Sequence, residues 1–164
     1  MKFEESSKQK INEAITNNCW LYMEEEVPVP FGWEIPIFYL DYCAVYELGA
    51  PTGVLSFTLP KAESIHEINS FVEGFAEFLR NKVSSTQLLV YLSRTGTGHT
   101  SEGDDIFLLQ SEGCTGLTVL DGDAKLKKEL RKGDLVYIPS RYKFELQPLT
   151  PSCTVAFTLE KNND

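Results

Sequence analysis

The stretch Gly133-Asp134-Leu135-Val136-Tyr137-Ile138-Pro139 decides the fold of this chain. Gly and Asp favour a tight turn, so residues 133 and 134 lead the chain into a strand. The four apolar residues 135–138 then form the strand, and Pro139 ends it because proline has no N–H to donate to a neighbouring strand. The stretch therefore predicts a short buried strand, followed by a loop after Pro139.

Further short strands are expected on both sides of this stretch. After residue 86, apolar segments recur at a spacing of about 8–12 residues, with turn residues between them. The expected strands are 87–92, 105–110, 116–120, 125–130, 134–138, 143–148 and 153–159. Such a series is typical of a β-sandwich or a β-barrel.

The first 85 residues have a different pattern. Apolar residues at helical spacing predict helices over 6–17 and 64–83, and two apolar segments between them, 37–46 and 54–59, predict strands. We therefore expect an α+β fold that is mainly β. It forms a single domain over residues 1–164, with helices and outer strands in 1–85 and the barrel core in 86–160.

Composition and charge exclude several classes of protein. The chain has 24 Asp and Glu against 15 Lys and Arg, and the net charge of −9 argues against nucleic acid or an anionic membrane as partner. No apolar run approaches the ~20 residues that cross a bilayer. The first ten residues, MKFEESSKQK, lack the apolar core of a secretion signal, so we expect a cytoplasmic protein.

Two parts of the sequence resemble the cupin superfamily. The stretch 133–139 is similar to the second cupin motif. The segment 88–93, His99 and the segment 105–113 together resemble the JmjC-type branch, which includes Fe(II)- and 2-oxoglutarate-dependent protein hydroxylases. In that branch a Tyr-Leu-Ser-like strand end is followed by an H-x-D pair and then by an Asp-hydrophobic-Phe-x-x-Gln-x-x-Gly strand. The resemblance covers roughly residues 86–160 and implies a double-stranded β-helix, an antiparallel barrel, with N-terminal flanking helices.

The same resemblance implies a degenerate metal site. The family holds iron by two His and one carboxylate on one face. His99 stands at the first of these positions, but Ser101 replaces the carboxylate of the H-x-D pair, and Phe144 stands where the distal His belongs. We therefore expect no cofactor. The alternative is Fe(II) with 2-oxoglutarate at atypical ligands, for which His99, Asp104 and Asp105 are weak candidates.

Several other residues are candidate ligand-binding groups. Asp105 and Gln110 begin and end one strand, where they either line the cavity or make hydrogen bonds at the strand ends. Tyr91 either holds a ligand carboxylate or is a core tyrosine. In cupins the loop after the motif faces the cavity mouth, and there Arg141 can bind a carboxylate with two hydrogen bonds or lie on the surface. The full candidate set is Tyr91, His99, Asp105, Gln110, Arg141, Tyr142 and Phe144.

Three functional hypotheses follow. The leading one is a JmjC-like cupin that has lost iron-dependent oxygenase activity and serves binding or assembly, as a homodimer or as an accessory to another protein. The second is a hydroxylase with atypical ligands around His99. The third is a metal-free enzyme that acts on a small anionic ligand held by Arg141. The sequence does not identify the small-molecule or protein partner.

Overall fold

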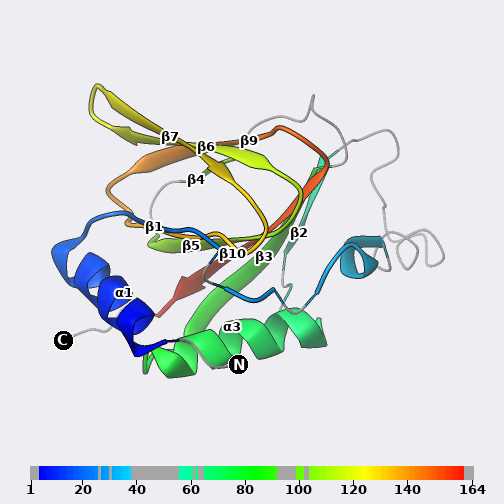
Figure 1. The fold of residues 1–164 in the computed structure, drawn as a ribbon, viewed down its shortest axis with the longest axis horizontal. Helices are drawn as coiled ribbons and strands as arrows, with labels where there is room; N and C mark the ends of the chain where they lie inside the picture. Colours follow the sequence, from blue (N-terminus) through cyan, green and yellow to red (C-terminus); the bar gives the residue numbers. More distant parts are fainter. Residues whose placement is uncertain are drawn as a thin grey trace.

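The computed structural model describes residues 4–25, 27–29, 31–37, 56–60, 62, 65–91, 99–101 and 104–160. Two β-sheets face each other, and the helices α1 (Glu5–Asn17) and α3 (His66–Phe78) lie outside the larger sheet (Figure 1). Of the expected strand 37–46, only residue 37 is described, and the rest lies outside the described residues. No helix among the described residues has the length and apolar character needed to cross a membrane.

The strands of the described residues are divided between the two sheets. The larger sheet has the order β1 (Leu21–Met23), β8 (Leu135–Ile138), β5 (Ile106–Glu112), β10 (Ser152–Leu159), β3 (Val83–Tyr91) and β2 (Ser56–Pro60). The smaller sheet has the order β4 (His99–Ser101), β9 (Lys143–Pro148), β6 (Thr115–Asp121) and β7 (Ala124–Leu130). Each of these strand pairs is antiparallel.

This topology confirms the predicted fold class, a mainly β cupin-type double-stranded β-helix with N-terminal helices. One detail of the prediction is wrong. Within the described residues, no strand pairing joins the larger sheet to the smaller one, so the structure is a β-sandwich with open edges rather than a closed barrel.

Alternating residues of the larger sheet contribute to two apolar layers, because successive side chains of a strand point to opposite faces. The interior layer lies between the sheets and includes Leu89, Tyr91, Leu108, Val136, Leu117 and Phe144. The helix-side layer lies between the larger sheet and the helices and includes Phe71, Phe75, Leu88, Phe107, Tyr137 and Phe157. The sheet is therefore buried on both faces.

The helix predicted over 64–83 ends earlier than expected. It stops at Phe78 because Arg80 has a left-handed backbone, with φ of 57°. The N–H of Asn81 then donates to the carbonyl of Ala76, and the N–H of Arg80 to that of Glu77, a pairing that closes a helix C-terminus. Val83 consequently begins β3 instead of extending the helix.

Candidate functional site

The two replaced ligand positions face each other across one strand pair. β4 pairs with β9 in a register that puts Ser101 opposite Phe144 and His99 opposite Leu146. The Phe144 side chain is 1% exposed and belongs to the interior layer, and its partner on the other neighbouring strand is Val119. An apolar ring therefore fills the space where the resemblance expected an imidazole.

Asp105 is held on the other face of the larger sheet. One carboxylate oxygen, Oδ2, accepts a hydrogen bond from the Tyr137 hydroxyl at 3.1 Å, and Oδ1 accepts one from the Ser140 N–H at 2.8 Å. Tyr137 belongs to the helix-side layer, so this carboxylate does not approach Phe144. Asp104 is exposed. The structure therefore does not bring these two weak metal candidates to the interior.

The described residues do not fit the iron centre that the resemblance implies. No group of three His, Cys, Asp or Glu side chains in the described part of the chain is arranged to hold a metal ion. At the matched positions, Ser101 and Phe144 supply neither a carboxylate nor a second imidazole. These side chains therefore support no reaction step through iron.

Gln110 is fully buried, and its amide makes its contacts within the protein. Its Nε2 donates to the Glu112 carbonyl at 2.8 Å and to the Thr115 hydroxyl at 3.0 Å, and its Oε1 accepts from the Thr154 hydroxyl at 2.7 Å. These are the contacts of a strand-end residue that fixes the turn between β5 and β6. A role for Gln110 in lining a cavity stays a prediction.

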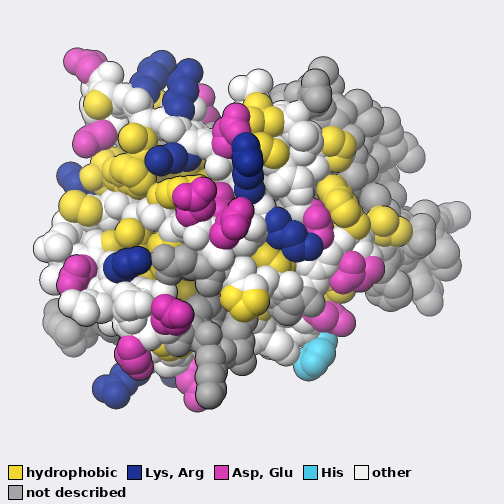
Figure 2. Space-filling view, in the orientation of Figure 1, with side chains coloured by type: hydrophobic (Ala, Val, Ile, Leu, Met, Phe, Trp, Pro, Cys, Tyr) yellow, Lys and Arg dark blue, Asp and Glu magenta, His cyan; other side chains and the backbone are white. Residues whose placement is uncertain are grey.

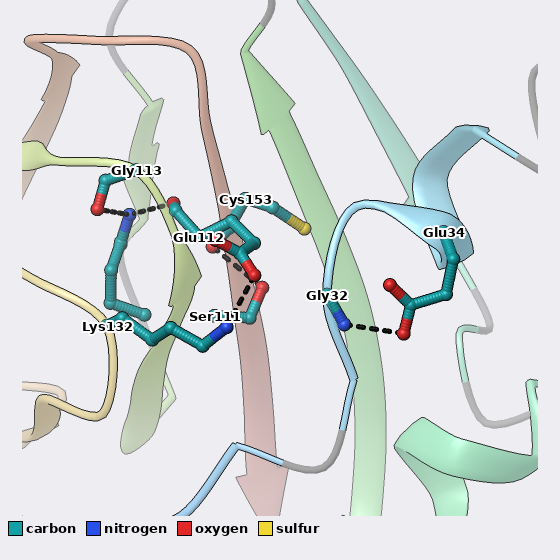
Figure 3. A network of polar contacts seen from close by, with 8 residues as sticks. Gly32, Glu34, Ser111, Glu112, Gly113, Lys132 and Cys153 are labelled. Atoms are coloured by element: carbon teal, nitrogen blue, oxygen red, sulfur yellow. Dashed lines mark hydrogen bonds and ion pairs between the residues drawn. The ribbon is translucent and has the colours of Figure 1, made fainter.

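The neighbouring polar contacts fix the same end of β5. The Lys132 ammonium lies 2.6 Å from a Glu112 carboxylate oxygen (Figure 3). The Ser111 hydroxyl donates to the Cys153 carbonyl at 3.0 Å, which ties β5 to β10.

On a separate segment, the Gly32 N–H donates to the Glu34 carboxylate at 2.8 Å, and this bond lowers the Glu34 pKa.

Tyr91 lies in the interior layer and is 5% exposed. Burial raises the pKa of its hydroxyl, so the side chain is a neutral phenol at physiological pH. Its partner across the strand pair is Ser152, whose buried hydroxyl makes no hydrogen bond to any described residue. Nothing in the sequence marks Ser152, because a serine between proline and cysteine resembles an ordinary loop residue.

Arg141 contacts the end of α1. Its Nε donates to the Asn18 carbonyl at 2.8 Å, and its guanidinium carbon lies 4.3 Å from the centre of the Tyr142 ring. A second guanidinium nitrogen donates to the Tyr142 hydroxyl. Tyr142 itself is buried in the interior layer. In this structure the Arg141 guanidinium therefore donates to protein groups, the Asn18 carbonyl and the Tyr142 hydroxyl. Carboxylate binding by Arg141 stays a prediction.

Asp134, the acid of the Gly-Asp pair, has a role beyond the turn that the sequence predicts for it. It is 1% exposed and accepts hydrogen bonds from the Tyr22 hydroxyl at 2.9 Å, the Glu25 N–H at 2.8 Å and the Arg131 N–H at 2.7 Å. The first two donors lie more than 100 positions earlier in the chain. Asp134 therefore anchors the N-terminal segment to the start of β8.

Alkaline pH is expected to weaken this anchor. Burial, followed by the hydrogen bond to Asp134, raises the pKa of Tyr22 from 10.0 to about 12. Because the folded state favours the neutral phenol, its contribution to stability is complete below pH 10 and is lost as the pH rises to about 12. Urea unfolding between pH 9 and pH 12 should show a smaller loss of stability in Tyr22→Phe than in wild type. Equal losses in both proteins would contradict this assignment.

Comparison with known proteins supports the fold. No family model and no curated protein match the chain. Among solved structures, the ribosomal oxygenase YcfD from Escherichia coli in complex with cobalt and 2-oxoglutarate matches with a TM-score of 0.56 and 19% identity, over 66% of this chain and 32% of that chain. Another YcfD structure has a TM-score of 0.56 and 20% identity over the same shares. The chain thus spans about a third of the length of these structures and has the cupin/JmjC fold.

These comparisons contradict the expectation that no cofactor is used. YcfD has been solved with cobalt and 2-oxoglutarate and also with cobalt and succinic acid, so solved structures of this fold hold both a metal and a small dicarboxylate. The expectation rested on Ser101 and Phe144 alone. Two replaced side chains do not exclude a metal or a small dicarboxylate from a protein of this fold. The prediction that no cofactor is used is therefore wrong.

Proposed function

We propose that this chain is a JmjC-fold binding or assembly module that has lost iron-dependent oxygenase turnover. The observation that carries the proposal is the buried Phe144 ring, which lies on the strand position opposite Ser101, where the fold's hydroxylases need ligands. The proposal concerns turnover, and it is compatible with a small molecule bound elsewhere in the fold.

The physical argument rests on coordination. An iron centre that activates oxygen needs three protein ligands on one face and open positions beside them. A phenyl ring has no lone pair for a metal, and the hydroxyl of a serine is a poor substitute for a carboxylate. The Phe144 ring is also buried in one cluster with Leu117 and Val119 of β6, so an apolar side chain stands at this ligand position.

An assembly role would use the outer surfaces of the sheets, because Phe144 and the other residues of the interior layer are buried. Lys125, Lys127 and Lys128 lie on β7, a strand that pairs on one side only among the described residues. Figure 2 shows Lys and Arg side chains gathered over the β6–β7 hairpin. Lysines on an edge strand discourage strand-to-strand pairing. A homodimer would therefore use another surface, and analytical ultracentrifugation tests for it.

A turnover assay tests the loss of oxygenase activity. We expect purified protein supplied with Fe(II), 2-oxoglutarate and air to release succinate at the rate of the protein-free control. The double variant Ser101→Asp with Phe144→His should bind Fe(II) at least about tenfold more tightly than wild type, because it restores both missing ligands.

The matched control is Ser101→Asp with Phe144→Leu, which adds the acid without the imidazole and should gain less affinity than the restored pair. Circular dichroism establishes that each variant is folded. Succinate release by wild type that requires both Fe(II) and 2-oxoglutarate, and that disappears in His99→Ala, would overturn the proposal.

A further inference from the structure

A cavity of about 340 Å³ lies on the helix side of the larger sheet. It forms where β5, β8 and the end of β10 approach the second half of α1, and in Figure 1 the arrowhead of β10 ends beside this helix. The volume is within the range of about 300–1,000 Å³ that is usual for small-ligand sites. Because Phe107 and Tyr137 in its wall belong to the helix-side layer, the cavity is separate from the interior around Phe144.

The charged residues that line this cavity are both acids. Asp105 lies in the wall and Glu160 at the rim, and no described Lys, Arg or His side chain lines it. Each oxygen of Asp105 accepts one hydrogen bond, from Tyr137 or from Ser140, so each retains a lone pair for another donor. Glu160 is exposed, and no described residue donates to its carboxylate. The described lining of the cavity is therefore acidic and has capacity to accept hydrogen bonds.

Apart from Asn81, the remaining wall is aromatic and aliphatic. The Phe107 and Tyr137 rings lie in the wall with their centres 5.0 Å apart, and Leu159 and Ile15 contribute aliphatic surface. Ile15 is one of three large apolar side chains that are exposed among the described residues, at 37%. The Phe107 and Tyr137 rings are 1% and 2% exposed, so they form closed apolar wall, and the aliphatic side chains at the rim can cover an alkyl chain.

We propose that this cavity binds a small alkylammonium ion, a primary amine on a short apolar chain. The ammonium group would donate to Asp105 and Glu160, and the alkyl chain would lie against Ile15 and Leu159. The two carboxylates disfavour an anion. A neutral apolar molecule would desolvate them without offering a hydrogen bond in return. This site is independent of the proposed function, because it lies on the opposite face of the sheet from Phe144.

Titration with n-hexylammonium, followed by NMR of ¹⁵N-labelled full-length protein, tests the proposal. We expect saturable shifts concentrated at the amides of residues 105–107, 137, 138, 140, 159 and 160. The matched probes 1-hexanol and hexanoate have the same chain with a neutral or an anionic head, and they should bind at least about tenfold more weakly. Equal binding of the amine and the alcohol, or shifts spread over the whole surface, would overturn the proposal.

A variant separates the carboxylate contribution from apolar binding. Glu160→Gln should weaken hexylammonium binding about 2- to 5-fold, the size expected for an exposed ion pair, and should leave hexanol binding unchanged. Glu160 is exposed, so this change is not expected to impair folding. Glu145→Gln, an exposed acid on β9 of the other sheet, is the matched control and should bind like wild type. Unchanged affinity in Glu160→Gln would reject the assignment.

Discussion

Gly113→Ala is expected to lower the free energy of unfolding by about 4 kcal/mol, among the largest effects of a single methyl group in this chain. Gly113 has a φ of +70°, and a Cβ atom at this position would lie 1.9 Å from the Pro151 carbonyl oxygen and 2.8 Å from the Ser152 Cα. Both are backbone atoms, so neither can rotate away. Urea unfolding followed by circular dichroism measures the loss.

Gly122→Ala is the matched control. Gly122 has a similar φ of +59°, but a Cβ atom there would meet nothing within 4 Å. Its cost should therefore be limited to the strain of a left-handed alanine, about 1–2 kcal/mol. If the two variants lost equal stability, the close approach of the β5–β6 turn to residues 151 and 152 would not be the cause.

Asp134→Ala is expected to lower the free energy of unfolding by a similar amount, about 4 kcal/mol. The change leaves three donors without their acceptor, the Tyr22 hydroxyl and the N–H groups of Glu25 and Arg131. An unsatisfied donor away from water costs about 1–3 kcal/mol, and bonds to a charged acceptor are the stronger kind. Thermal and urea unfolding should both show the loss.

Two further variants isolate the cause. Asp123→Ala removes an exposed acid from the β6–β7 turn and should cost less than about 1 kcal/mol. Asp134→Asn keeps one acceptor oxygen and should fall between wild type and Asp134→Ala. An Asp134→Ala protein as stable as Asp123→Ala would show that the three hydrogen bonds contribute little.

The strands could be predicted well because their signals are local. The alternation in 153–159 and the Gly-Asp…Pro stretch at 133–139 lie within a few residues, and β10 and β8 form there. The end of α3 could not be predicted, since a left-handed backbone at Arg80 has no glycine to signal it. Closure of the barrel was wrongly expected because it depends on pairing between edge strands, which no short stretch encodes.

The candidate site was only partly predictable for the same reason. The resemblance identified positions 101 and 144 as replaced ligands, but their pairing depends on the register of β4 with β9. For Asp105 the sequence alone leaves two roles open. Its hydrogen bonds to Tyr137 and Ser140 join residues more than 30 positions apart, and both these bonds and its place in the wall of the helix-side cavity become visible only once the fold is known.

The pairing of β1 with β8 has a consequence for protein synthesis. During translation, residues 21–25 are made more than 100 residues before their partners at 134–137. β1 must therefore wait for its partner while the residues between them are made, which is the interval in which unpaired apolar segments associate wrongly. A product that stops before residue 134 would carry Tyr22 and Met23 without β8 and without the Asp134 carboxylate.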